Sequence, residues 1–183
     1  MNMKKGAILA FILVWLLFLF AMAAVAGWDP LEHEKEKAAV EKTITKFKEA
    51  DPSMKVFFEK AYSYSVFPGI GQGGFIIGGG HGYGWVYEKG IHVGVATVTD
   101  LSVGAQIGGQ SFAEVIFFAD KSTFDDFKKG DWQLGAQASA VLVKQGASKD
   151  ATYNNGVAVF TMPNRGLMAK ASVGGQTFKY TPK

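Results

Sequence analysis

The chain contains no cysteine among its 183 residues. This absence excludes disulfide bonds, thiolate metal sites, cysteine nucleophiles and a lipid anchor attached through cysteine. A folded domain of this sequence must therefore be held together by noncovalent packing. The hydrophobic content of 48% and the aromatic content of 14% are sufficient for one domain with an ordinary core.

Metal and nucleotide motifs are also missing. The histidines His33, His81 and His92 do not have the spacing of metal ligands, so no metal site is expected. Residues 69–74 fit the G-x-G-x-x-G pattern, but a strand-like run follows them where a dinucleotide site needs a helix. No Gly-Lys-Ser or Gly-Lys-Thr occurs either. We therefore expect no cofactor.

Signals for catalysis and for nucleic-acid binding are weak. A hydrolytic site would have to be assembled from Ser111, Asp100 and either His81 or His92, and no G-x-S-x-G elbow supports it. His81 lies between glycines and is expected in a turn. Export, inferred below, argues against a nucleic-acid partner. We expect no catalytic residues and no enzymatic activity.

The N-terminus has the features of an export signal. Lys4 and Lys5 precede an uncharged apolar run over residues 6–26 that closes on a small-x-small cleavage pattern. Residues 1–26 are thus predicted to be a signal peptide. The run also reaches the ~20 residues that span a bilayer, so an uncleaved anchor is the alternative. Both interpretations place the rest of the chain in the periplasm or cell envelope.

Helices are predicted before a β-rich region. Asp29-Pro30 and Asp51-Pro52 each place a carboxylate before a proline, an arrangement that begins helices. The second helix has apolar residues at helical spacing, which docks it on a core: Met54, Phe57, Phe58, Ala61 and Tyr62. Ser122-Thr123 is predicted to cap a short helix over residues 124–129. We expect a helical segment at 27–60 and a domain at 61–183.

Glycine recurs every two or three residues from Phe67 to Phe118, among β-branched and aromatic side chains. Glycine weakens strand interiors, so such density implies close backbone approach or a sharply bent sheet, required by packing or by a ligand. Glu88-Lys89-Gly90 is short enough for a hairpin turn. Strand-like runs are predicted over residues 74–78, 84–88, 92–99, 102–108, 113–119, 132–143, 156–162 and 167–173.

These patterns predict an α+β fold, with N-terminal helices packed on a strongly curved, mainly antiparallel, glycine-rich sheet that has one short internal helix. Residues 143–183 are basic, because they contain six basic side chains and only Asp150 as an acid: Lys144, Lys149, Arg165, Lys170, Lys179 and Lys183. This end could face anionic lipid, or these side chains could lie on ordinary solvated strand faces.

A family resemblance covers roughly residues 61–180. It is carried by Ser65-Val66-Phe67-Pro68 through Gly73-Gly74-Phe75, by Gly104–Gln110, by Phe127–Gly130, and by Gly174-Gly175-Gln176. In these motifs, taken in order, the chain resembles the SYLF domain family of lipid-binding proteins. The resemblance implies a compact, noncatalytic α+β domain whose ligand is membrane phospholipid. It also points to phosphoinositides and actin, which eukaryotic members bind.

The chain departs from the eukaryotic members in its predicted signal, its lack of an SH3 domain and its short connection at Glu88-Lys89-Gly90. Actin and phosphoinositide binding are therefore not expected. The expected function is that of an exported, noncatalytic phospholipid-binding protein of the cell envelope, in which Arg165, Lys170, Lys144 and Lys179 meet head groups. The alternative is a structural envelope protein without lipid, which binds a protein partner through residues 29–50.

Overall fold

A computed structural model of the chain describes residues 30–72, 80–100, 110–135, 139–165, 173 and 175–183. The chain forms two compact units, residues 1–36 and 37–183, and every described strand lies in the second. Three helices are described: α2 (Pro30–Ala50), α3 (Met54–Lys60) and α4 (Lys121–Lys128).

Two helices begin at other residues than predicted. Helix α3 begins at Met54 rather than at Pro52, and its N-cap residue Ser53 makes no side-chain cap hydrogen bond. The Asp51 carboxylate accepts a 3.1 Å hydrogen bond from the Ser53 amide just before α3, and it also accepts hydrogen bonds from Ser148, a residue far along the chain. Helix α4 begins at Lys121, because the carboxylate of Asp120, not Ser122-Thr123, accepts a 2.9 Å hydrogen bond from the Thr123 amide.

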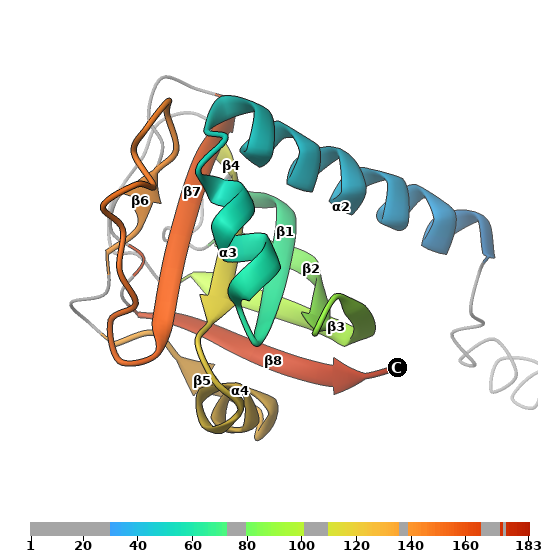
Figure 1. Cartoon of the computed structure of the whole chain (residues 1–183). Coiled ribbons are helices and arrows are strands. Elements are labelled where there is room, and N and C mark those ends of the chain that lie inside the picture. Colours follow the sequence, from blue (N-terminus) through green and yellow to red (C-terminus); the bar gives the residue numbers. More distant parts are fainter. Residues whose placement is uncertain (1–29, 73–79, 101–109, 136–138, 166–172, 174) are drawn as a thin grey trace, which may run out of the picture. The chain divides into compact units, whose positions relative to one another are not determined.

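The strands form one 8-stranded sheet in the order β5-β8-β3-β2-β1-β4-β7-β6 (Figure 1). Neighbouring strands are antiparallel except for the parallel pair β6 and β7. With the helices, this confirms the predicted α+β fold. The strand bounds are β1 Ser63–Gln72, β2 Gly80–Glu88, β3 Ile91–Asp100, β4 Gln110–Phe118, β5 Trp132–Gln133, β6 Val141–Leu142, β7 Val157–Arg165 and β8 Gln176–Pro182.

Several strand predictions are confirmed and others are not. Predicted runs lie in β2, β3, β4 and β7, and the hairpin turn between β2 and β3 has positive φ at Lys89 (50°) and Gly90 (78°). His81 lies in β2, so its predicted place in a turn is wrong. The run at 132–143 forms only the short strands β5 and β6. The predicted strands at 74–78, 102–108 and 167–173 lie essentially outside the described residues.

The sheet is strongly curled. Gln176 on β8 donates a 3.2 Å hydrogen bond to Glu114 on β4. In a flat sheet these strands would be four spacings apart, roughly 19 Å. Glycine permits this curl: a Cβ on Gly84 would lie 2.5 Å from the carbonyl oxygen of Val66 and 2.6 Å from the Phe67 ring. At this position packing, rather than a ligand, requires glycine.

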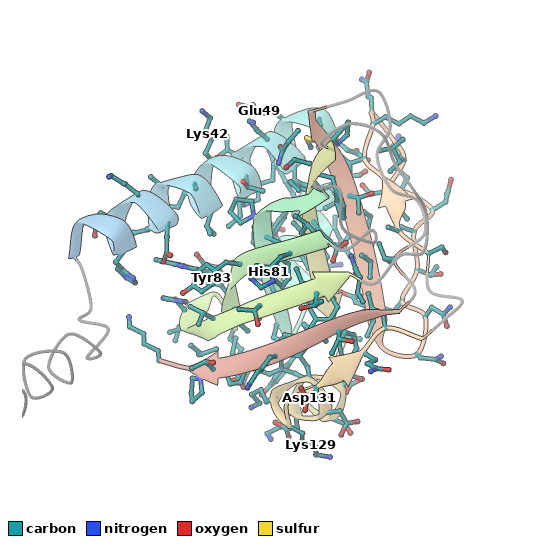
Figure 2. All side chains as sticks on the ribbon, turned by 180° about the vertical axis from the view of Figure 1, so that it is seen from behind. Lys42, Glu49, His81, Tyr83, Lys129 and Asp131 are labelled. Carbon is teal, nitrogen blue, oxygen red and sulfur yellow. The ribbon has the colours of Figure 1, made fainter. Side chains whose placement is uncertain are left out.

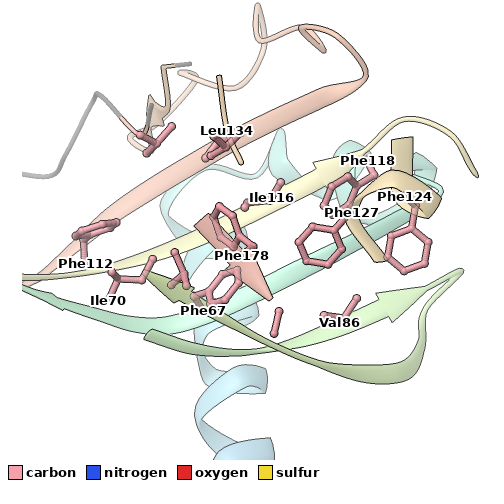
Figure 3. Packing of buried hydrophobic residues seen from close by; sticks show 14 residues of the cluster. Phe67, Ile70, Val86, Phe112, Ile116, Phe118, Phe124, Phe127, Leu134 and Phe178 are labelled. Atoms are coloured by element: carbon pink, nitrogen blue, oxygen red, sulfur yellow. The ribbon is translucent and has the colours of Figure 1, made fainter. Parts of the chain in front are cut away.

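Each face of the curled sheet has its own core. The interior cluster fills the concave side, where Phe67, Phe118 and Phe178 are fully buried and α4 adds Phe124 and Phe127 (Figure 3). The outer cluster lies on the opposite face beneath the helices of the second unit. Its buried members come from α2, α3 and the strands: Val40, Phe47, Met54, Phe57, Val66, Trp85, Ala113, Val115, Phe117, Val143, Ala158 and Phe160.

Candidate functional site

A groove of about 500 Å³ opens on the outer side of the sheet, between α3 and the segment that precedes β7. We call it the α3 groove. Its surface is mainly apolar, and lysines stand on both of its walls. The lining residues are Ser53, Val56, Phe57, Lys60, Ser148, Lys149, Ala151, Thr152 and Tyr153.

The floor of the groove is part of the outer cluster. The Phe57 ring packs edge-on against Phe160, with 4.8 Å between centroids, and lies 5.4 Å from Phe117 and 5.7 Å from Tyr153. Val56, which precedes Phe57 in the sequence, is 50% exposed. Val56 extends the apolar surface of the floor toward solvent, and a mainly apolar groove suits an apolar ligand.

The far wall of the groove is fixed by a buried carboxylate. Asp51, which is 1% exposed, accepts 2.7 Å hydrogen bonds from both the amide and the hydroxyl of Ser148. The Ser53 hydroxyl donates to the same carboxylate at 2.6 Å. Burial raises the pKa of Asp51, but the hydrogen bonds from Ser148 and Ser53 outweigh burial and hold this pKa well below its usual range. The ionised carboxylate thus ties the 148–153 segment to α3.

The charge of the groove is positive. Lys60 and Lys149 are both exposed, and none of the described residues that line the groove is acidic. Burial raises the pKa of Tyr153, which keeps its hydroxyl neutral at physiological pH. An apolar floor with a cationic rim is complementary to an anionic amphiphile.

A second groove, of about 570 Å³, lies between β5 and the turn that leads into β7. Its walls are more polar, and its described lining has an acid, Asp126, but no lysine or arginine. The two grooves therefore differ in both polarity and charge. Of the two, only the α3 groove combines an apolar floor with cations.

Two of the four predicted lipid-binding residues, Lys144 and Lys179, have described side chains. Lys144 and Lys179 are both exposed, but Lys144 follows β6 and Lys179 lies on β8, near opposite ends of the strand order. Arg165 is the last residue of β7, and Lys170 lies outside the described residues. These two lysines lie on different parts of the sheet, and the grouping of all four residues stays a prediction.

In the described part of the chain, the concave face of the sheet is covered by its own packed side chains. Every phenylalanine of the interior cluster except Phe112, which is 3% exposed, has no exposed surface. The large hydrophobic side chains that are exposed lie scattered on other elements: Val56, Tyr83, Ile91 and Leu142. The described part of the sheet interior therefore offers no open apolar surface to an acyl chain.

Three residues considered for hydrolysis lie on three different strands: His81 on β2, His92 on β3 and Ser111 on β4. His92 stacks on Trp85 with ring centroids 3.9 Å apart, and its Nε2 lies 3.0 Å from the carbonyl oxygen of Gly94. His81 is exposed on β2, near Tyr83 (Figure 2). Ser111 and His81 both pair with Gly71 from opposite sides, so two strand spacings, roughly 10 Å, separate their backbones.

Two features are lacking in the described part of the chain. In that part of the chain no cluster of three or more histidine, aspartate or glutamate side chains is arranged to hold a metal ion. No described helix combines the length and the apolar character needed to cross a bilayer. Residues 1–26, the predicted signal or anchor, lie outside the described residues.

Sequence reasoning missed the residues of the α3 groove. Val56 lies off the helical stripe of Met54, Phe57 and Phe58. An apolar residue outside the buried stripe was the sequence feature that could have indicated an apolar surface here. Lys149 and Tyr153 come from a segment that looks like a polar loop. Only tertiary packing places that segment against α3.

Comparison with known proteins supports one family. Residues 99–181 match the Ysc84 family, which is described as "Las17-binding protein actin regulator". The chain is also similar to Beta cell expansion factor A from Aeromonas veronii, with 30% identity over 129 residues, or 69% of this chain and 49% of that protein. The chain thus spans about half the length of this curated relative. These matches agree with the motifs and with the α+β fold: the chain carries a Ysc84 (SYLF) family domain.

Proposed function

We propose that this protein is an exported, noncatalytic phospholipid-binding protein of the cell envelope. The observation that carries the proposal is the α3 groove, where an apolar floor lies between Lys60 and Lys149. The Ysc84 family domain and the motifs shared with lipid-binding SYLF proteins support the same ligand class. The location in the envelope rests on the signal peptide or anchor predicted at residues 1–26.

The physical basis is a combination of two weak attractions. Each lysine near an anionic bilayer contributes ~1 kcal/mol, an attraction that salt screens within a Debye length. Burial of acyl groups against the groove floor adds ~0.8 kcal/mol for each methylene. Lys144, Lys179, Arg165 and Lys170 remain candidates for additional contacts with a membrane surface. Together these terms predict reversible, salt-sensitive association.

Liposome sedimentation tests this function. The full-length protein is mixed with vesicles of phosphatidylcholine alone or of phosphatidylcholine with phosphatidylglycerol, each at low and at high salt. We expect cosedimentation with the anionic vesicles at low salt and a loss of binding as salt rises. Equal recovery in the supernatant under all conditions would overturn the proposal.

A structural or partner-binding envelope protein remains the second candidate. The observation that favours it is the sealed sheet interior, because glycines such as Gly84 serve packing there. A partner would bind the exposed charged face of α2, where Lys42 and Glu49 point to solvent (Figure 2). Crosslinking that captures a partner, and loses it in the Lys42→Glu, Glu49→Lys variant, would favour this function if lipid binding is absent.

A further inference from the structure

We propose that the α3 groove binds a monoacyl phospholipid, with its single acyl chain along Val56 and Phe57 and its phosphate between Lys60 and Lys149. This inference rests on the proposed lipid-binding function and names the site and the ligand. The proposed ligand is a single lipid molecule rather than the surface of a membrane. The four residues that carry it come from α3 and from the segment that follows β6.

The size of the groove favours one chain. Its volume of about 500 Å³ lies in the lower half of the range for small-molecule sites, roughly 300 to 1,000 Å³. The floor is closed, since the Phe57 ring rests on Phe117 and Phe160, which are themselves fully buried. An acyl chain therefore has no route from the groove into the interior cluster, and a second chain would remain in water.

The charge of the rim favours an anionic head group. Lys60 stands at the C-terminal end of α3 and Lys149 on the opposite wall. Glu59 and Asp150, the acidic neighbours of these lysines in the sequence, do not line the groove. A phosphate that meets both lysines gains two cationic contacts, whereas an uncharged lipid gains none.

The groove is formed before a ligand arrives. Asp51 holds Ser148 and Ser53, which are lining residues on opposite walls, and the Oγ atoms of these two serines lie 2.5 Å apart. Because these bonds already order the 148–153 segment, a ligand loses less binding free energy in ordering it. Preorganisation of this kind is expected of a site for one small molecule.

The test is direct titration of the full-length protein with palmitoyl lysophosphatidylglycerol below its micelle concentration, followed by calorimetry and by native mass spectrometry. Two variants alter the groove. Val56→Asp places a charge on its apolar part, and the double variant Lys60→Glu, Lys149→Glu reverses the charge of both lysines. The matched control is Lys121→Glu, Lys129→Glu at the two ends of α4, which has the same charge change at exposed lysines that do not line the groove.

We expect a complex with one lipid per chain, an affinity at least about tenfold weaker in both groove variants, and little change in the control. Vesicle sedimentation of the same proteins separates the two levels of the proposal. Wild type that binds anionic vesicles but not the monoacyl lipid, or binds that lipid equally in the groove variants, would overturn this inference and leave the proposed function intact. Failure in both assays would overturn both.

Two further outcomes would assign the groove to another occupant. Palmitate that binds as tightly as the monoacyl phospholipid would show that the phosphate is not recognised. A concentration-dependent dimer, detected by light scattering and lost in Val56→Asp, would show that a second copy of the chain covers the groove. Either result contradicts the inference as stated.

Discussion

The interior cluster and the α3 groove both use phenylalanine, but only one of them is closed. In the interior cluster, rings from distant strands and from α4 pack on one another, and Phe118, Phe127 and Phe178 have no exposed surface. In the α3 groove, Phe57 packs on Phe117, Phe160 and Tyr153 and is 9% exposed, and half of Val56 remains exposed. The difference separates stability from the proposed binding: the curled sheet holds the fold together, and a helix beside it carries the exposed apolar side chain.

The largest expected effect comes from emptying the interior cluster. Phe178→Ala removes a ring that lies 5.5 Å from Phe67 and 5.6 Å from Trp132, and it leaves a cavity. We expect the free energy of unfolding to fall by about 3 to 5 kcal/mol, measured by urea denaturation. A loss below 1 kcal/mol would mean that the interior is loosely packed, and the contrast between the two regions would fail.

Overpacking the same region should have a smaller effect. In Gly84→Ala the new Cβ would lie 2.5 Å from the Val66 carbonyl oxygen, so the strands must shift and the free energy of unfolding should fall by about 2 kcal/mol. Gly71→Ala is the matched control, because no atom lies within 4 Å of a Cβ built there. Equal stability of the two variants in thermal denaturation would contradict a packing role for Gly84.

The wall of the groove can be loosened through its buried carboxylate. Asp51→Asn weakens the hydrogen bonds from Ser148 and Ser53 and should lower the free energy of unfolding at pH 7 by about 2 kcal/mol. The double variant Asp51→Asn, Ser148→Ala should lose less than the sum of the two single changes, because the partners share one interaction. Additive losses would show that the two residues act separately.

The pH dependence of this contribution has a defined sign. The pKa of Asp51 is lower in the folded protein than its ordinary value near 4, so the folded state favours the ionised carboxylate. The stability from Asp51 is complete above about pH 5 and is lost as pH falls through the folded pKa. The difference between wild type and Asp51→Asn should therefore be constant from pH 5 to 8 and shrink below about pH 4. A difference that grows on acidification would contradict this assignment.

The smallest effect on stability is expected from a substitution at the surface of the groove. Val56→Asp should change the free energy of unfolding by less than about 0.5 kcal/mol, because Val56 is half exposed. The same substitution should weaken cosedimentation with anionic vesicles. Val56→Asp that unfolds the protein would place Val56 in the core, and the division between the two regions would be lost.

Local patterns predicted much of the fold. Proline at Pro30 and apolar spacing identified two helices, and Glu88-Lys89-Gly90 identified a hairpin. Strand β1 was missed because Pro68 and Gly69 interrupt it, and at this point its register with both neighbours shifts. Tertiary pairing overrides the local preference of such residues.

The site was less predictable than the fold. Sequence distance grouped Arg165, Lys170, Lys144 and Lys179, whereas the sheet order separates Lys144 from Lys179. The α3 groove depends on the contact between Asp51 and Ser148, residues separated by 97 positions. No local pattern encodes a pairing of this kind. The residues of the α3 groove come together in space only when the outer cluster has formed.

The most direct test of the account is photocrosslinking with a phospholipid that carries a diazirine on its acyl chain. The full-length protein is bound to vesicles that contain this lipid, irradiated, digested and mapped by mass spectrometry. The account predicts labels within residues 53–60 and 148–153, which form the walls of the α3 groove. Labels concentrated on the interior cluster, at residues such as Phe67, Phe118 or Phe178, would contradict it.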